Sequence, residues 1–150
     1  MPQSELHPDR FDHLEMAREI IHDNPAITGK ICVSANVQIG QILPLMSETV
    51  RFLNLIAFQE TQLTPSVKVD LAWHEFILCT RYYQSWCERH WHHFIHHNPG
   101  GDPQQNQNNF KTTIKLYQKY FGNTPVEFWG QLDKADCGNC SAISDKQLSS

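Results

Sequence analysis

A row of bulky side chains in the middle of the chain constrains the fold more than any other feature. Thr64 and Pro65 combine a capping hydroxyl with a proline suited to the first helical position, and together they predict a helix start. Beyond them, packing residues recur at alternating intervals of four and three, the spacing of one helix face. These residues are Val69, Trp73, Phe76, Thr80, Tyr83 and Cys87. We interpret the row as a packing seam and expect a mostly α fold.

Two helices are predicted in the N-terminal half of the chain. Asp9 is the expected N-cap of the first, which carries one apolar stripe and stops near Asn24, because the following Pro25 disfavours helical backbone there. The second runs to about Gln59, and Pro44 can lie in its first turn. Its apolar residues point in most directions, which is typical of a central core helix.

Residues 31–39 are the exception to the helical pattern. Ile31, Val33, Ala35, Val37 and Ile39 alternate with polar or small residues, and a period of two is typical of a half-buried strand. No partner strand is evident, and a lone strand is a poor structure. A helix imposed by tertiary contacts is the alternative. The sequence leaves a short strand, an extended segment or a helix open here.

The C-terminal half shows weaker patterns. The polar segment 104–109 is expected to form a loop. A short helix follows and should end at Gly122, and Thr124–Pro125 opens a last turn that carries Phe128 and Trp129. We therefore expect a leader over 1–8, one compact helical domain over 9–130, and a polar tail over 131–150.

Composition narrows the classes of function. The net charge of −4 gives no basic surface for nucleic acid or for an anionic membrane. No apolar run approaches the roughly 18 residues that span a bilayer, and the N-terminus has no apolar signal-peptide core. Five cysteines, an odd number, argue against a disulfide framework. We expect a cytoplasmic protein whose partner is a small molecule or another protein of unknown identity, in an unknown oligomeric state.

The stretch 69–99 concentrates groups that bind metals or exchange protons, with six of the nine histidines. Asp70 and His74 are four residues apart on the predicted helix, so that both lie on one face, as two metal ligands would. The alternative is a hydrogen bond that closes a helix surface.

Five more histidines lie between residues 90 and 97. If the helix persists, His92 with His96 and His93 with His97 form further pairs suited to zinc, copper or iron. The alternative is a solvated turn that binds no metal. His97 can return to His74 only if the helix breaks, because the chain from Trp91 to His97 reaches at most about 20 Å whereas His74 lies roughly 26 Å away along an unbroken helix. One site containing Asp70, His74 and His97 thus predicts a helix break before His90.

Two sets of cysteines could also carry chemistry. Cys87 could act as a nucleophile beside a histidine base, or as a small buried hydrophobe. Cys137 and Cys140 form a CxxC pair, which is half of a zinc-binding pattern, a redox pair, or two incidental thiols in a tail.

The central residues resemble a known family. The run VDLAWHEFILCTRYYQSWC, followed by FIHHNP, is similar to bacterial glycine-rich domain-containing protein-like proteins, which are related to a domain of plant glycine-rich domain proteins. The resemblance covers about Leu53 to Cys140. Two departures are Phe76, where many members have histidine, and His92, where members usually have glycine. The resemblance implies a compact, mostly helical domain and supplies no activity.

These observations lead to one leading hypothesis and two competitors. The leading hypothesis is a domain that binds a divalent metal ion, zinc or iron, through Asp70, His74 and His97, with His96 next, at which hydrolytic or redox chemistry could occur. The first competitor is a non-enzymatic interaction module in which the same residues form a structural polar network. The second is a thiol enzyme that uses Cys87.

Overall fold

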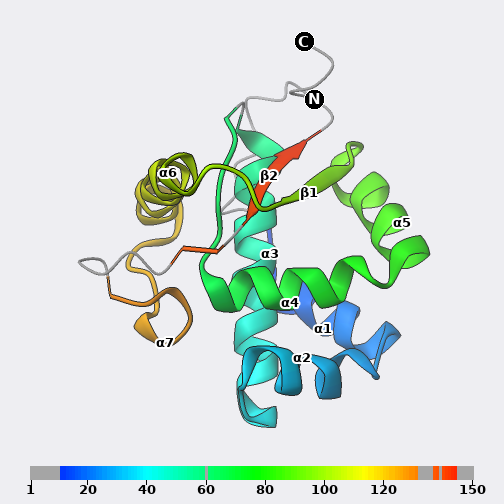
Figure 1. Ribbon diagram of the computed structural model, residues 1–150. Coiled ribbons are helices and arrows are strands. Elements are labelled where there is room, and N and C mark those ends of the chain that lie inside the picture. Colours follow the sequence, from blue (N-terminus) through cyan, green and yellow to red (C-terminus); the bar gives the residue numbers. More distant parts are fainter. Residues whose placement is uncertain (1–10, 60, 132–136, 139, 145–150) are drawn as a thin grey trace.

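The computed structural model describes residues 11–59, 61–131, 137–138 and 140–144 and confirms a mostly α fold (Figure 1). Its elements are α1 (His13–Asp23), α2 (Ile27–Ala35), the 3-10 turn η3 (Ile39–Gln41), α3 (Ile42–Phe58), α4 (Val67–Ile77), α5 (Thr80–Trp91), β1 (Ile95–Pro99), α6 (Pro103–Phe121), α7 (Val126–Trp129) and β2 (Cys140–Ser144). Within these residues, no helix is both long and apolar enough to cross a membrane.

Helix α3 is the centre of the core. It is buried on nearly all sides, as its sequence predicts, and it contacts α1, α2, α4, α6 and both strands. Figure 1 shows α4 crossing α3, with α5 on one side of the molecule and α6 and α7 on the other. The core therefore fixes the N-terminal end of α4 relative to the C-terminal elements.

A buried carboxylate joins α3 to α6 and α7. Glu48 Oε2 accepts hydrogen bonds from the Tyr117 hydroxyl at 2.6 Å and from Trp129 Nε1 at 2.9 Å. Its other oxygen accepts one from Arg51 Nη1 at 2.9 Å. Burial is tolerated because each carboxylate oxygen has a partner and because Arg51 supplies an opposite charge.

The helix predicted after Thr64–Pro65 is two helices. The break falls at Leu78 and Cys79, so the predicted break before His90 is confirmed. The second helix, α5, ends at Trp91, and His92 follows in the left-handed conformation with φ 61°. The chain can then turn back towards α4.

The two strands were not predicted. β1 and β2 pair antiparallel, with His97 opposite Ala142 and Pro99 opposite Cys140. Leu63 extends the pairing, since its backbone exchanges hydrogen bonds with Ala142 at 3.3 and 2.8 Å. Residues 140–144, which the sequence placed in a polar tail, are therefore packed into the fold, while the expected leader lies outside the described residues.

Residues 31–39 form no strand, so the extended segment suggested by their alternation is wrong. Ile27, Ile31 and Ala35 are buried at intervals of four residues on α2, which packs against α4. Val33 is 84% exposed and Ile39, in η3, is 77% exposed. The alternation is thus coincidental, and the helical alternative holds through Ala35.

Two predicted helix starts and one predicted loop also differ from the structure. Asp12, not Asp9, caps α1 by accepting a hydrogen bond from the Glu15 amide. Ser66, not Thr64, caps α4, and the Thr64 hydroxyl instead donates to the Cys140 carbonyl at 2.9 Å. The expected loop 104–109 belongs to α6, because Asp102 and the proline after it form a strong helix start that outweighs the polar composition.

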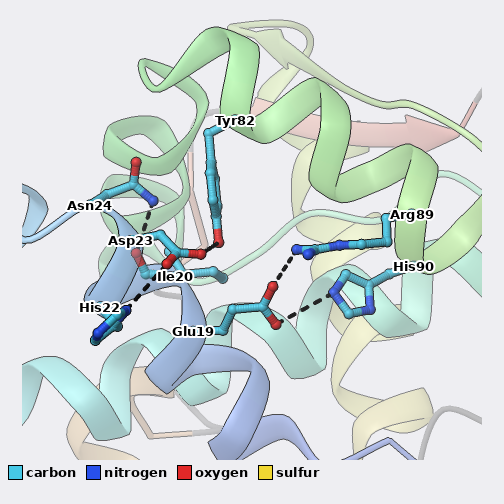
Figure 2. A network of polar contacts seen from close by, with 8 residues as sticks. All are labelled: Glu19, Ile20, His22, Asp23, Asn24, Tyr82, Arg89 and His90. Carbon is cyan, nitrogen blue, oxygen red and sulfur yellow. Dashed lines mark hydrogen bonds and ion pairs between the residues drawn. The ribbon is translucent and has the colours of Figure 1, made fainter.

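Polar contacts fasten α1 to α5 at the surface (Figure 2). Glu19 pairs with Arg89 and approaches His90, whose Nε2 lies 3.9 Å from its Oε2. One turn along α1, Asp23 accepts a hydrogen bond from the Tyr82 hydroxyl at 2.8 Å. These pairs set the position of α5 relative to the N-terminal helices.

Candidate metal centre

Three potential metal ligands meet where α4, β1 and β2 converge. Asp70 lies in the first turn of α4, His97 in the middle of β1, and Cys140 at the start of β2. The ligand atoms of the three side chains all lie within 4.8 Å of one another. Among the described residues, no other group of three or more His, Cys, Asp or Glu side chains comes this close.

Asp70 is the hub of the group. Its Oδ1 lies 2.9 Å from His97 Nε2 and accepts a hydrogen bond from the Cys140 thiol at 3.0 Å. Cys140 is fully buried, whereas the Asp70 and His97 side chains keep 18% and 17% exposure. Solvent therefore reaches the group through Asp70 and His97 and not through Cys140.

Strand pairing explains why His97 and Cys140 are close. His97 is opposite Ala142, and Cys140 is two residues from Ala142 along β2. In an antiparallel pair, such diagonal neighbours lie on the same face of the sheet and within reach of long side chains. Asp70 is fixed independently by α4, where its amide donates to Ser66 O at 2.9 Å.

The environment of Cys140 favours its neutral thiol. Burial is the main cause that raises its pKa well above the ordinary value, and the neighbouring Asp70 carboxylate raises it further. The metal-free group thus holds a protonated thiol that donates to a carboxylate. A bound cation would reverse this preference, because metals bind the thiolate.

The segment before Cys140 packs closely over Asp70. The Gly138 amide donates to Pro65 O at 2.7 Å. A side-chain Cβ at position 138 would lie 3.0 Å from Asp70 Cβ and 3.1 Å from its Oδ2. The half-buried Cys137 forms an isolated bridge with Ser66, which places it beside the start of α4. Residue 139 lies outside the described part of the chain.

An aromatic wall holds the His97 ring. Trp73 packs edge-on against His97, with ring centroids 4.6 Å apart. Trp73 Nε1 donates to the Tyr83 hydroxyl, which in turn donates to Ile95 O at 2.7 Å. The wall connects α4, α5 and β1, and it limits the rotamers open to His97.

The remaining predicted residues lie at different distances from this centre. His74 is exposed beside it, with its ring centroid 6.1 Å from that of His97, but its nitrogens lie outside the three-ligand group. His96 faces away, because successive residues of a strand point to opposite faces. Cys87 is fully buried in the core.

The predicted helical pairs of His92 with His96 and of His93 with His97 are wrong, because α5 ends at Trp91. His92, His93 and His96 line a separate cavity instead. The sequence assigned Cys140 to a separate pair with Cys137, whereas the structure brings the Cys140 thiol to Asp70. The CxxC pattern was the available signal, but its partners could not be read from spacing.

The fold and this site define a compact helical domain with a candidate Asp–His–Cys metal centre beside a two-stranded sheet. Residues 41–123, more than half of the chain, match the family model described as UCP032817-like. The chain therefore belongs to the UCP032817-like family. No curated protein and no solved structure matches it. The matched range contains Asp70 and His97, whereas Cys140 lies beyond it.

Proposed function

We propose that this protein is a metal-binding domain whose first three ligands are Asp70, His97 and Cys140. The observation that carries the proposal is the convergence of a carboxylate, an imidazole and a thiol within 4.8 Å, from three segments distant in sequence. The buried thiol also donates a hydrogen bond to the carboxylate. A cation bound here would displace the thiol proton, so that the two side chains would become two anionic ligands.

The ligand set favours zinc over iron. Zinc accepts sulfur, nitrogen and oxygen ligands together and prefers four of them in a tetrahedron. Cys137 is our choice for the fourth ligand because it completes the CxxC pair and lies beside the start of α4. His74 is the alternative. A site closed by Cys137 would be structural, whereas a site with water in the fourth position would support hydrolytic or redox chemistry.

The resemblance to glycine-rich domain-containing protein-like proteins supports the same region as the functional one. Its central motif includes Asp70, His74 and His97, which also lie within the range matched by the family model. We propose that members sharing these residues and the CxxC pair share the metal centre.

A structural polar network is the competing function for these residues. It is favoured by the hydrogen bonds that join Asp70 to His97 and Cys140. In that case the domain would be an interaction module, and the network would only hold the sheet against α4.

Elemental analysis of tag-free protein separates the two functions. We expect close to one equivalent of zinc in the unmodified protein, and loss of it in Asp70→Ala, His97→Ala and Cys140→Ser variants. Cys87→Ser and His96→Gln are matched controls of the same residue types outside the centre, and they should retain the metal. Absence of zinc and iron even after loading, with all variants folded, would leave the polar network as the function.

A further inference from the structure

The cavity lined by His92, His93 and His96 lies on the opposite side of β1 from the candidate metal centre. It has a volume of about 840 Å³ and opens between the exposed face of α5 and the turn that leads into β1. Ligand pockets commonly measure about 300–1,000 Å³, so the cavity could hold a small organic molecule. We propose that it binds a polyhydroxylated ligand, of the size of a mono- or disaccharide.

The polar groups around this cavity offer donors and acceptors together. Thr80, Gln84 and Ser85 contribute two hydroxyls and an amide from α5. Each of these groups can both donate and accept a hydrogen bond. A ligand with several hydroxyls matches such a lining, because a hydroxyl also does both.

Three imidazoles add to this mixed lining. His92 and His93 come from the turn and His96 from β1. A neutral imidazole has one donor and one acceptor nitrogen, so these side chains suit hydroxyl groups as well. Their ligand atoms do not form a cluster of the kind seen at Asp70, which favours a molecule that spans the cavity over a single ion.

Charge argues against an anionic ligand. Glu88 is the only carboxylate among the residues found to line the cavity, and that lining contains no lysine or arginine. A phosphate or carboxylate would meet this negative charge without a fixed positive partner. A hydroxyl, by contrast, donates readily to a carboxylate.

Aromatic rings provide the apolar part of the site. Tyr83 and Phe94 meet edge-on with centroids 5.3 Å apart. Tyr83 is only 1% exposed and its hydroxyl is engaged with Trp73 and Ile95, so the half-buried Phe94 supplies the accessible ring. The C–H face of a sugar ring can pack on such a surface while its hydroxyls contact the rim.

The backbone at the rim is strained. His92 has φ 61°, a left-handed conformation that glycine adopts more readily than any other residue. Glycine would relieve this strain, but it would remove an imidazole from the cavity. A His92→Gly variant therefore separates ligand binding from stability, since only the binding should decline.

NMR titration of the full chain with a panel of monosaccharides and disaccharides tests the proposal. We expect at least one sugar to shift the imidazole resonances of His92, His93 and His96 with a dissociation constant on the order of millimolar or tighter. Phe94→Ala, Glu88→Gln and His92→Gly should each weaken that binding several-fold. His22→Gln, which removes an exposed histidine elsewhere, should leave it unchanged.

Two outcomes would overturn the proposal. One is a panel that shifts none of these resonances at concentrations on the order of tens of millimolar. The other is selective binding of benzoate or of Zn²⁺ in this cavity, which would assign it to an anion or to a second metal. Repeating the titration with Cys140→Ser shows whether binding is independent of the metal centre, as we expect.

Discussion

At the residue scale, Gly138 and Cys140 determine the geometry and the charge of the candidate centre. Gly138 brings its backbone to Pro65, where a Cβ would lie only 3.0 Å from Asp70 Cβ. Cys140 supplies a thiol that burial and Asp70 keep protonated. Gly138 therefore determines how closely the C-terminal segment approaches α4. The proton on the Cys140 thiol is what a cation must displace.

Gly138→Ala should destabilise the protein by about 1–3 kcal/mol, because the new methyl overpacks against Asp70 and the Pro65 carbonyl. Urea denaturation of the metal-free protein would measure this change. Gly29→Ala is the matched control: it adds the same methyl within α2, where no atom lies within 4 Å. That variant should gain about 0.5–1 kcal/mol. Equal effects of the two substitutions would contradict the close packing over Asp70.

Metal affinity should rise with pH because Cys140 must lose its proton to become a ligand. Since burial and Asp70 raise the pKa of this thiol, we expect Cys140 to contribute about a tenfold increase in apparent affinity per pH unit, and to keep contributing above the range where an ordinary cysteine is ionised. Competition with a chromophoric chelator at several pH values would measure the slope. Cys140→Ser should remove this contribution and make the slope shallower, and an unchanged slope in that variant would exclude Cys140 as a ligand.

At the scale of elements, local sequence signals located several helix ends but did not reveal the sheet. Gly122 and Thr124–Pro125 correctly predicted where α6 ends and α7 begins, since capping chemistry acts within one turn. The pairing of β1 with β2 joins residues 41 to 49 positions apart, and no local pattern encodes it. The same limit applies to the site, where Asp70 and His97 were predicted together but Cys140 was placed elsewhere.

The contacts of Glu48 predict a large effect where α3, α6 and α7 meet. Glu48→Ala should cost about 3–5 kcal/mol in unfolding free energy, because it leaves the partly buried Arg51 charge and the buried Tyr117 and Trp129 donors without their acceptor. Denaturant unfolding followed by tryptophan fluorescence would measure it. Glu15→Ala is the control: it removes an exposed carboxylate paired with Arg18 and should change stability by less than about 0.5 kcal/mol. A small effect at Glu48 would show that this network does not hold the elements together.

At the scale of the whole molecule, the contact between α1 and α5 links global stability to pH (Figure 2). Burial lowers the pKa of His90, and the adjacent Arg89 charge lowers it further. The folded state therefore takes up this proton less readily than the unfolded state. Stability from this source is complete above the unfolded pKa of about 6.5 and is lost as the pH falls through the lower folded value.

A His90→Gln variant should consequently show a shallower loss of stability between about pH 7 and pH 5 than the unmodified protein. Thermal unfolding across this range would measure the difference. His22→Gln removes a side chain that is 89% exposed and should retain the original slope. If both variants behave like the parent, another group dominates the acid sensitivity.

The pairing of β1 with β2 also sets an order of events during protein synthesis. The helical segments through α5 and strand β1 are synthesised before β2, and at about 5–20 residues per second the intervening residues take roughly 2–8 s. During that interval Asp70 and His97 have been synthesised, but the Cys140 thiol does not yet exist. The nascent chain thus passes through a stage at which most of its helices have been synthesised and its candidate metal centre lacks a ligand.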